Sequence, residues 1–502
     1  MTELIRQSRL PVAFILLLLA YFLVQSLSFS AFKSGADIDT TELMMYNQFW
    51  SLGYWGSQPP LYNWLTHLAA DIFGTSVFVY AAVKFMLLFL AFACVYLSAR
   101  ELGFRTGPAI ASTLGIFAVP EIAWEAQRAL SHSAAVNAFC AMSLFAFVRL
   151  RNHRRIADYG FFGLAAAAAV LSKYNGVLFV AALLLAALTI GSFSRPIRDR
   201  KIVVSAVVFG AAILPHLLWV LANLDIVFHR QIKFGIGDGI ASAGDRLSAF
   251  LSWAGSTVLT SAVVMVAVGA AFVVDRFRGR AWTVEIGDAS RLLVCLILIF
   301  QLVLLGMLLV FGATRMENRW LQPVLLILPL TVLALFGSGP RPASSEEPIG
   351  NPGLTRTFSV LGLVVMAVTL VALPVSETVM GRIKGNETHY AYDVLLNELE
   401  TRLSGPVGTV VSNESDVFGN ILLYEPGIGF YNDNLVRAGH PVQAPAVLMW
   451  SGHGDVPGHL SAVARELGFT GNDSRVFRSS MPVNGNERTV DYSYIVREET
   501  DR

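Results

Sequence analysis

Long apolar runs alternate with short polar connections along most of this chain of 502 residues. A membrane-spanning helix needs about 20 mostly apolar residues. Runs that approach this length lie at 11–29, 75–97, 107–120, 133–149, 203–222, 249–274, 292–313, 321–337 and 358–377. The apolar segment 159–193 is long enough for two further short spans, broken at Ser172–Gly176, "SKYNG". The pattern therefore predicts eleven crossings of a membrane.

Basic residues fall in every second gap between these spans. The clusters are Arg6/Arg9, Arg100/Arg105, Arg149/Arg151/Arg154/Arg155, Arg195/Arg198/Arg200/Lys201 and Arg276/Arg278/Arg280. Short cytoplasmic loops keep an excess of Lys and Arg, so we expect a cytoplasmic N-terminus and, with an odd number of crossings, a C-terminus on the outer side. The alternative for the first run is a cleaved signal peptide, but the run is long for a signal core.

The pattern changes near residue 377 to charged residues, Gly and Asn. Short β-like runs, "VGTVVS", "NILLY", "AVLMW" and "RTVDYSYIV", follow a helix-like segment, "AYDVLLNELETRL". We therefore expect an α-helical polytopic membrane domain at 1–377 and a small outer α/β domain at 378–502, which is long enough to fold as a unit. The Pro/Gly/Ser-rich stretch 338–356 is predicted to be a cytoplasmic linker.

Composition supports a membrane protein and excludes other classes. Hydrophobic residues make up 54% of the chain and charged residues 15%, against about 25% charged residues in soluble domains. A net charge of +1 gives no basic footprint for nucleic acid. The three cysteines lie inside predicted spans and no cluster has metal-ligand spacing, so no metal site or cofactor is predicted and metal dependence stays open.

The first outer loop, residues 30–74, is long for a simple connection. Asp39 or Thr40 is expected to cap a helix that ends at Gly53. Pro59 and Pro60 exclude a helix at their position and stiffen the loop. The aromatics of "GYWGSQPPLYNW" (Gly53–Trp64) suit the lipid headgroup layer, so an aromatic belt is one reading of this loop.

Charged side chains favour a second reading, in which the outer surface acts on a lipid. The other outer segments supply Glu121, Glu125, Arg128, His132, Lys173, His229, Arg230, Lys233, Arg315, Glu317 and Arg319. Ionisable groups near a bilayer are costly and are usually retained to pair or to act. Cations at this boundary suit an anionic lipid phosphate, although Arg315 and Arg319 can also pair with Glu317, and Lys173 can extend to the interface.

The motifs "GYWGSQPPLYNWL", "EAQRALSHS" and "LSKYNG" resemble the polyprenyl-phosphate-dependent glycosyltransferases of the class C fold. This superfamily includes the protein O-mannosyltransferases and the lipid A aminoarabinose transferases, and the motifs look most like the bacterial lipopolysaccharide galacturonosyltransferases. The resemblance implies a sugar donor on polyprenyl phosphate, a lipid A or core oligosaccharide acceptor, and transfer outside the bacterial inner membrane. Galacturonic acid is the implied sugar, with mannose and aminoarabinose as alternatives.

The resemblance also implies site residues. The acidic residue fourteen positions before Gly53 is Asp39, the expected catalytic base. Many relatives have an acidic pair here, whereas this chain has Asp39 and Thr40, with Glu42 further on. This chain has Gln58 where aminoarabinose transferases have Lys, and His132 where they have Asp. The implied substrate-binding residues are Gln58, Tyr62, Arg128, His132, Lys173, Arg230, Lys233, Arg315 and Arg319.

Two other functions fit a membrane protein that handles a lipid-linked sugar. A transporter or flippase would place polar groups at the membrane midplane and show internal repeats, whereas here the unusual residues gather on one face. A polymerase or ligase of lipid-linked polysaccharide would share the donor type but transfer a whole glycan.

Overall fold

The computed structural model describes residues 2–55, 58–129, 131–224, 242–311, 316–337, 351–403, 405–470, 475–485 and 487–498. The chain forms two compact units. Unit 1 contains Met1–Val24, Leu52–Tyr62 and Lys84–Val371, and unit 2 contains Gln25–Ser51, Asn63–Val83 and Ala372–Arg502. The 30–74 loop therefore contributes residues to both units.

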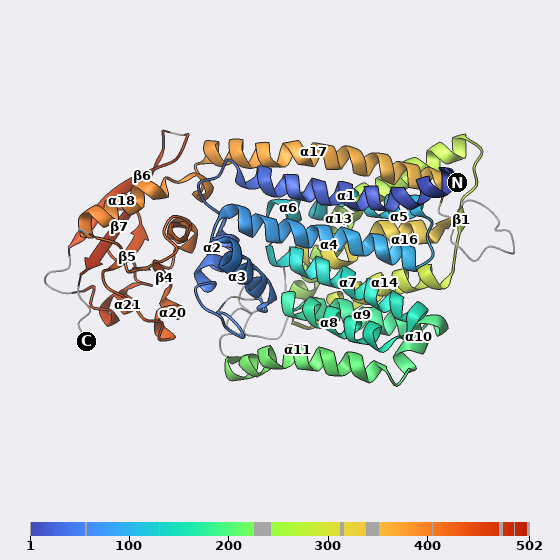
Figure 1. Ribbon diagram of the computed structural model, residues 1–502, viewed down its shortest axis with the longest axis horizontal. Helices are drawn as coiled ribbons and strands as arrows, with labels where there is room; N and C mark the ends of the chain where they lie inside the picture. The colour runs from blue at the N-terminus through green and yellow to red at the C-terminus, as the bar shows by residue number, and fades with distance from the viewer. Residues whose placement is uncertain are drawn as a thin grey trace. The chain divides into compact units, whose positions relative to one another are not determined.

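Unit 1 is built from apolar helices. They are α1 (Thr2–Ser30), α4 (Val77–Glu101), α5 (Thr106–Leu114), α6 (Ala126–Arg128), α7 (Ser131–His153), α8 (Ile156–Ser172), α9 (Gly176–Leu188), α10 (Gly191–Arg198), α11 (Ile202–Ala222), α13 (Ala243–Phe277), α14 (Asp288–Phe311), α15 (Gln322–Leu325), α16 (Leu328–Leu335) and α17 (Pro352–Lys384), of which α1, α4 and α17 continue into unit 2. The long helices of this unit run in roughly one direction (Figure 1).

Within the described residues, seven helices are long and apolar enough to cross a membrane, or up to ten spans if each of three bent pairs counts as one. The predicted spans coincide with these helices, and the expected break at "SKYNG" lies between α8 and α9. The predicted span 107–120 ends at a bend, because the helical stretches Thr106–Ala118 and Glu121–Arg128 meet at an angle of 79°. The chain is thus a multi-pass membrane protein, and the count of eleven crossings stays a prediction.

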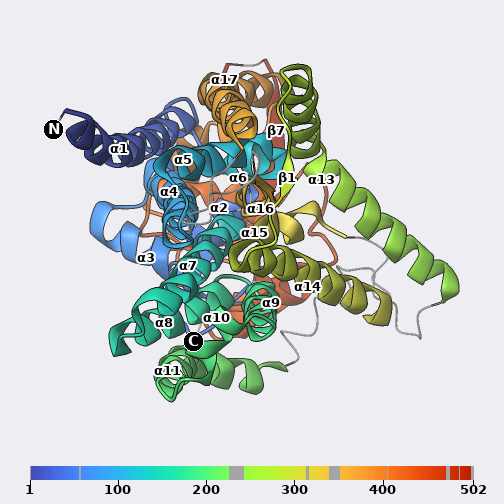
Figure 2. The ribbon, with the colours of Figure 1, turned by 90° about the vertical axis from the view of Figure 1, so that its right-hand side faces the viewer.

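Small residues allow the helices of unit 1 to approach closely. A Cβ atom added at Gly163 of α8 would lie 2.4 Å from the carbonyl oxygen of Ser205 on α11. One added at Gly362 of α17 would lie 2.3 Å from the carbonyl of Leu114. Close backbone contact of this kind is how helices gain van der Waals energy where lipid supplies no hydrophobic driving force. In the view of Figure 2, α7, α8, α9 and α10 form one group of neighbouring helices.

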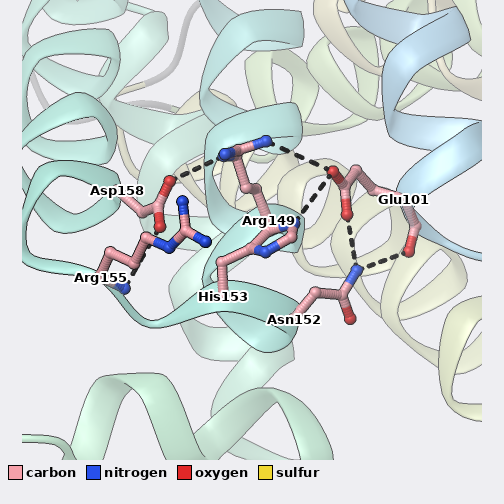
Figure 3. A network of polar contacts seen from close by, with 6 residues as sticks. All are labelled: Glu101, Arg149, Asn152, His153, Arg155 and Asp158. Atoms are coloured by element: carbon pink, nitrogen blue, oxygen red, sulfur yellow. Dashed lines mark hydrogen bonds and ion pairs between the residues drawn. The ribbon is translucent and has the colours of Figure 1, made fainter.

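A polar network joins the ends of α4 and α7 to the start of α8 (Figure 3). The guanidinium of Arg149 lies 2.7 Å from Asp158 and 3.7 Å from Glu101. Glu101 also accepts a hydrogen bond of 2.7 Å from the Asn152 amide and lies 3.6 Å from His153. These contacts fix three helix ends. They lie at the opposite end of α7 from Ser131, about 27–33 Å away for a helix with 1.5 Å rise per residue.

Unit 2 contains a five-stranded mixed sheet in the order β4-β3-β5-β7-β6. The strands are β3 (Thr409–Val411), β4 (Gly429–Tyr431), β5 (Ala446–Ser451), β6 (Val476–Pro482) and β7 (Thr489–Arg497). Strands β4, β3 and β5 are parallel, whereas β7 runs antiparallel to both β5 and β6. The predicted helix in "AYDVLLNELETRL" is confirmed as α18 (Tyr392–Leu403), and β3, β5 and β7 lie in predicted β-like runs.

One predicted strand of unit 2 is wrong. "NILLY" lies in a 3₁₀ helix, η6 (Gly419–Leu423), that directly follows α19 (Ser415–Phe418). Its apolar side chains Ile421 and Leu422 are buried, so a short buried helix produced the same apolar run as a buried strand.

The predicted helix of the 30–74 loop also differs from the observed one. Helix α2 (Ile38–Tyr46) ends at Tyr46 rather than at Gly53. Its N-cap is Asp37, whose carboxylate accepts a hydrogen bond of 2.9 Å from the Thr40 amide, so neither Asp39 nor Thr40 is the cap. Helix α3 (Leu61–Phe73) begins directly after Pro60, as the two prolines predict.

Candidate functional site

The candidate base lies in the first turn of α2, in unit 2. Asp39 is half-buried, and Asp37 rather than Asp39 supplies the capping oxygen. Glu42 lies three residues further along, so both carboxylates share one side of the helix. The buried residues of α2 include Leu43, Met44 and other apolar side chains. This arrangement leaves Asp39 without a capping role.

The segment before α2 is fastened to the C-terminal part of unit 2. The Asn420 side chain accepts a hydrogen bond of 2.7 Å from the Ala36 amide and donates one of 3.1 Å to the Ala36 carbonyl. The backbone amides of Ser34 and Gly35 both donate to the Thr388 carbonyl, at 3.0 and 3.1 Å. A Cβ at Gly35 would meet the Glu387 carbonyl at 2.8 Å, so this contact is tight. The backbone that leads to Asp39 is therefore held by hydrogen bonds on two sides.

Acidic groups lie close together at this attachment. Burial, and then the charges of Asp37 and Asp416, raise the pKa of Glu387. Lys33 lowers it by a smaller amount, and the Lys33 ammonium lies 3.2 Å from Glu377. Among the described residues no group of His, Cys, Asp or Glu could hold a metal ion. The acidic groups are thus a feature of the attachment.

The second group of candidate residues lies in unit 1, around the N-terminal half of α7. The Lys173 ammonium donates a hydrogen bond of 2.9 Å to the Ser133 hydroxyl. One turn further along α7, the Asn137 amide donates to the Gln322 side chain at 2.9 Å. The Asn175 amide in turn lies 3.4 Å from the Trp320 carbonyl. We call these residues, Ser133, Asn137, Lys173, Asn175, Trp320 and Gln322, the α7 ring.

A buried lysine that sequence reasoning missed lies beside the same part of α7. Lys84 of α4 is only 3% exposed, and its ammonium lies 3.5 Å from the Arg128 carbonyl and 5.1 Å from the Phe85 ring centroid. A lone lysine inside the apolar run 75–97 is itself the signal that could have found it, because an ionisable residue in a span is a functional candidate by default.

Two predicted residues and a further contact complete this part of unit 1. The Tyr62 ring, 1% exposed, lies 5.1 Å from the His132 ring. The Arg128 guanidinium pairs with Glu125 at 2.9 Å. Lys84 thus lies beside Arg128, and Lys173 lies beside Ser133.

Segment 52–54 is held against α11. The Leu52 carbonyl lies 2.9 Å from the Nδ1 atom of His216, whose ring is flanked by Tyr174 and Trp219. A Cβ at Gly53 would lie 2.2 Å from the Trp219 ring, so only glycine fits here without movement. The "GY" of the motif is thus a place of close approach between the loop and a helix.

The structure brings together some predicted residues and not others. Four of the predicted residues lie around α7: Tyr62, Arg128, His132 and Lys173. Arg319 directly precedes Trp320 of the α7 ring. Arg319 pairs with Glu317 at 3.8 Å, as the pairing alternative expected. Gln58 is half-buried and directly precedes the two prolines. Arg230, Lys233 and Arg315 lie outside the described residues.

Comparisons with known proteins agree with this architecture. The family model of dolichyl-phosphate-mannose-protein mannosyltransferase matches residues 57–219, which include Tyr62, Lys84, Arg128, His132 and Lys173. Among solved structures, ArnT from Cupriavidus metallidurans bound to undecaprenyl phosphate is similar, with a TM-score of 0.53 and 14% identity over 96% of this chain and 97% of that chain. The fold is therefore the class C glycosyltransferase fold, as expected.

Two curated proteins of Rhizobium johnstonii are similar in sequence. The chain is 32% identical to the lipopolysaccharide core galacturonosyltransferase RgtB over 320 residues, which is 62% of this chain and 63% of RgtB. It is 27% identical to the lipopolysaccharide core galacturonosyltransferase RgtA over 449 residues, 87% of this chain and 86% of RgtA. The match to RgtB thus spans less than two thirds of that relative's length. The expected resemblance to class C glycosyltransferases is confirmed.

Proposed function

We propose that this chain is an integral membrane glycosyltransferase that moves one uronic acid residue from a polyprenyl phosphate to lipopolysaccharide. The observation that carries the proposal is the pair of buried lysines in unit 1, Lys84 beside the Arg128 carbonyl and Lys173 beside the Ser133 hydroxyl. Buried cations in a membrane protein suit an anionic lipid substrate. The names of RgtA and RgtB support galacturonic acid and the lipopolysaccharide core, with lipid A as the alternative acceptor.

The proposed reaction is a single displacement with inversion. The acceptor hydroxyl attacks the anomeric carbon of the sugar, and its proton passes to the Asp39 carboxylate. The bond between that carbon and the phosphate oxygen breaks, and its electron pair remains on the polyprenyl phosphate. Negative charge grows on the phosphate as the bond breaks, so a fixed cation such as Lys84 stabilises the transition state more than the ground state.

We further propose that the reaction takes place on the outer face of the bacterial inner membrane. The alternation of Lys and Arg clusters supports a cytoplasmic N-terminus. In this arrangement the domain at 378–502 is periplasmic, and its Asn420 holds the segment that leads to Asp39.

The proposal is tested with the purified full-length protein in lipid nanodiscs. Polyprenyl phosphates that carry galacturonic acid, mannose or aminoarabinose are supplied separately with a lipopolysaccharide acceptor, and free polyprenyl phosphate and the modified acceptor are quantified. We expect release of polyprenyl phosphate in step with addition of one sugar of inverted configuration. Absence of release from every donor would contradict a transferase.

The same material separates the two alternatives. In sealed vesicles, movement of the intact donor across the bilayer without release of polyprenyl phosphate would support a transporter. Transfer of an oligosaccharide in preference to a single sugar would support a polymerase or ligase. Nanodiscs and vesicles made with the Asp39→Asn variant are the matched control.

A further inference from the structure

Helix α2, which carries Asp39, is too short to hold its conformation alone. It has nine residues, Ile38–Tyr46, and isolated helices of fewer than about 12–15 residues are marginal in water. Most helical stability in proteins comes from packing and from contacts at the helix ends. The position of the Asp39 carboxylate therefore depends on what holds the chain before and after α2.

The chain before α2 is held by the side-chain amide of Asn420. This side chain is fully buried, and it pairs with both backbone groups of Ala36: its oxygen accepts from the amide at 2.7 Å, and its nitrogen donates to the carbonyl at 3.1 Å. The same nitrogen donates to the Tyr392 hydroxyl at 3.0 Å, and that hydroxyl donates to the Glu387 carbonyl at 2.9 Å. Because every atom of the amide has its partner, its orientation is fixed, and so is the backbone three residues before Asp39.

The chain after α2 is held in the same way by the side-chain amide of Gln48. Its nitrogen donates to the Phe430 carbonyl at 2.7 Å, and its oxygen accepts from the Phe430 amide at 2.9 Å. Phe430 belongs to β4, which lies at one edge of the five-stranded sheet. Edge strands present backbone N–H and C=O groups outward, and the Gln48 amide pairs with one of each. The Gln48 nitrogen also donates to the Met45 carbonyl at 2.7 Å, so the last turn of α2 is tied to the sheet edge.

Between these two attachments, α2 packs against the same part of unit 2. Thr41 is one of its buried residues. A Cβ atom added at Gly419, where α19 is followed by η6, would lie 3.4 Å from the Thr41 side chain and 3.6 Å from the Phe430 ring. Residues 387–431 therefore contact the chain before α2, one face of the helix, and the chain after it.

The position of a general base decides how well it works. A base must lie within hydrogen-bond reach of the proton that it removes. A displacement of about 1 Å can lower a rate by about 10²-fold, and hydrogen bonds behind a catalytic side chain commonly hold it in place. A shift of α2 would move the Asp39 carboxylate with it.

We infer that Asn420 and Gln48 are positioning residues for the proposed base: their two side-chain amides hold α2 so that the Asp39 carboxylate lies within reach of the acceptor hydroxyl. This inference rests on the proposed function, because Asp39 is the base of that reaction. It gives the C-terminal part of unit 2 a task in the chemical step. Loss of either amide should therefore slow proton transfer and leave binding of the sugar donor unchanged.

The first test compares kcat with KM in full-length protein in lipid nanodiscs. Asn420→Leu and Gln48→Met keep the approximate size of each side chain but cannot pair with the backbone. We expect each to lower kcat by about 10–100-fold and to leave KM for the polyprenyl-phosphate donor within about twofold. Ser493→Ala is the matched control, because it removes a buried hydrogen bond to the Gly452 carbonyl elsewhere in the same sheet, and it should keep kcat.

The second test is a double-mutant cycle with the base itself. If Asn420 acts through Asp39, Asn420→Leu should have no further effect on transfer in protein that already carries Asp39→Asn, because no base remains to be positioned. An equal fold-loss with and without Asp39 would show a merely structural role and overturn the inference. A raised donor KM with unchanged kcat in Asn420→Leu and Gln48→Met would also overturn it.

Amide hydrogen exchange gives a readout that does not depend on activity. In Asn420→Leu we expect faster exchange in α2 and unchanged protection in β5 and β7, because the loss of one attachment opens the helix locally. Unchanged exchange in α2 together with a lower kcat would overturn the inference. If Asn420→Leu does not fold, Gln48→Met, at a half-buried position, carries the cycle and the exchange measurement.

The failure of the inference and the failure of the proposed function have different signatures. Wild-type kcat in both amide variants, with active wild-type protein, would overturn the inference alone. Wild-type protein that transfers no sugar from any polyprenyl-phosphate donor would contradict the proposed function. Full activity of Asp39→Asn would contradict the proposed base and overturn the inference with it.

Discussion

At the scale of single residues, two aspartates two positions apart occupy different positions in α2. The sequence predicts an acidic residue and a helix start at this place but puts the cap at Asp39 or Thr40, because Asp is an equally good cap at position 37 or 39. The helix in fact begins at Ile38, so Asp37 is the cap and Asp39 lies in the first turn. The position of a helix start within one turn depends on tertiary contacts, here those of Ala36 with Asn420, that no local pattern reveals.

The different positions of Asp37 and Asp39 lead to a prediction for the proposed base. We expect Asp39→Asn to lower transfer by about 10²–10⁴-fold, since an amide cannot accept the acceptor's proton. Asp37→Asn is the matched control and should keep activity, because Asn caps as well as Asp. Transfer is measured in membranes with equal amounts of folded protein. Retained activity in Asp39→Asn would shift the base to Asp37 or Glu42.

Three histidines of unit 2 predict how stability depends on pH. Burial lowers the pKa of His67, His389 and His440 below the usual value near 6.5. The unfolded chain therefore takes up protons at a higher pH than the folded one, so the stabilisation is complete above pH 6.5 and is lost as pH falls through the folded pKa values. Glu387 has the opposite sign and acts lower, because its raised pKa favours the folded state below about pH 4.5.

We accordingly expect the Tm of purified protein to fall between about pH 7 and pH 5. The triple variant His67→Gln, His389→Gln, His440→Gln should show a flatter dependence over the same interval, as measured by intrinsic fluorescence during heating. An equal slope in both proteins, or a Tm that rises on acidification, would show that these imidazoles do not control the acid response.

At the scale of elements, the apolar runs predict the helices of unit 1 well, because a helix in lipid must satisfy its backbone internally and bury a continuous apolar surface. Bends in helices and the burial of polar side chains are less predictable from the sequence. The bend near Pro120 and the buried lysine of α4 both depend on which helices pack together. "NILLY" shows the same limit in unit 2, because buried strands and short buried helices have similar apolar patterns.

The contact between Gly53 and α11 predicts the effect of one methyl group. Gly53→Ala places a Cβ 2.2 Å from the Trp219 ring, and overpacking of this kind typically costs about 1–3 kcal/mol. We expect a lower Tm and lower transfer, and partial recovery of both in Gly53→Ala, Trp219→Ala. Gly210→Ala, on the same helix but with nothing within 4 Å of its added Cβ, is the matched control and should change neither. A harmless Gly53→Ala would show that segment 52–54 moves freely from α11.

At the scale of the whole molecule, the distribution of basic residues predicts orientation. A reporter fused after Arg502 should be active only outside the cytoplasm, and one inserted in 338–356 should be active only inside, since Lys and Arg clusters stay in the cytoplasm. Alkaline phosphatase and green fluorescent protein fusions measure the two locations. Activity of both fusions on one side would contradict the single span expected between 338–356 and the C-terminal tail.

The candidate site is predictable from the sequence only where it coincides with motifs. "LSKYNG" and "EAQRALSHS" identify Lys173 and the start of α7, because a lysine or histidine beside an apolar run is conspicuous. Asn137 and Gln322 are ordinary polar residues within helices, and only the fold places them 2.9 Å apart. A contact between residues that are 185 positions apart in the chain produces no local sequence pattern.

The contact between Asn420 and Ala36 has a consequence for the synthesis of the protein. Ala36 leaves the ribosome when almost the whole chain is still unmade, and the side chain that holds it follows 384 residues later. Translation adds about 5–20 residues each second, so the segment before Asp39 waits on the order of 20–80 s for its partner. Every helix of unit 1 after α1 is synthesised during that interval. A nascent chain stalled before residue 420 therefore has its spans but lacks the contact that fixes the segment before Asp39.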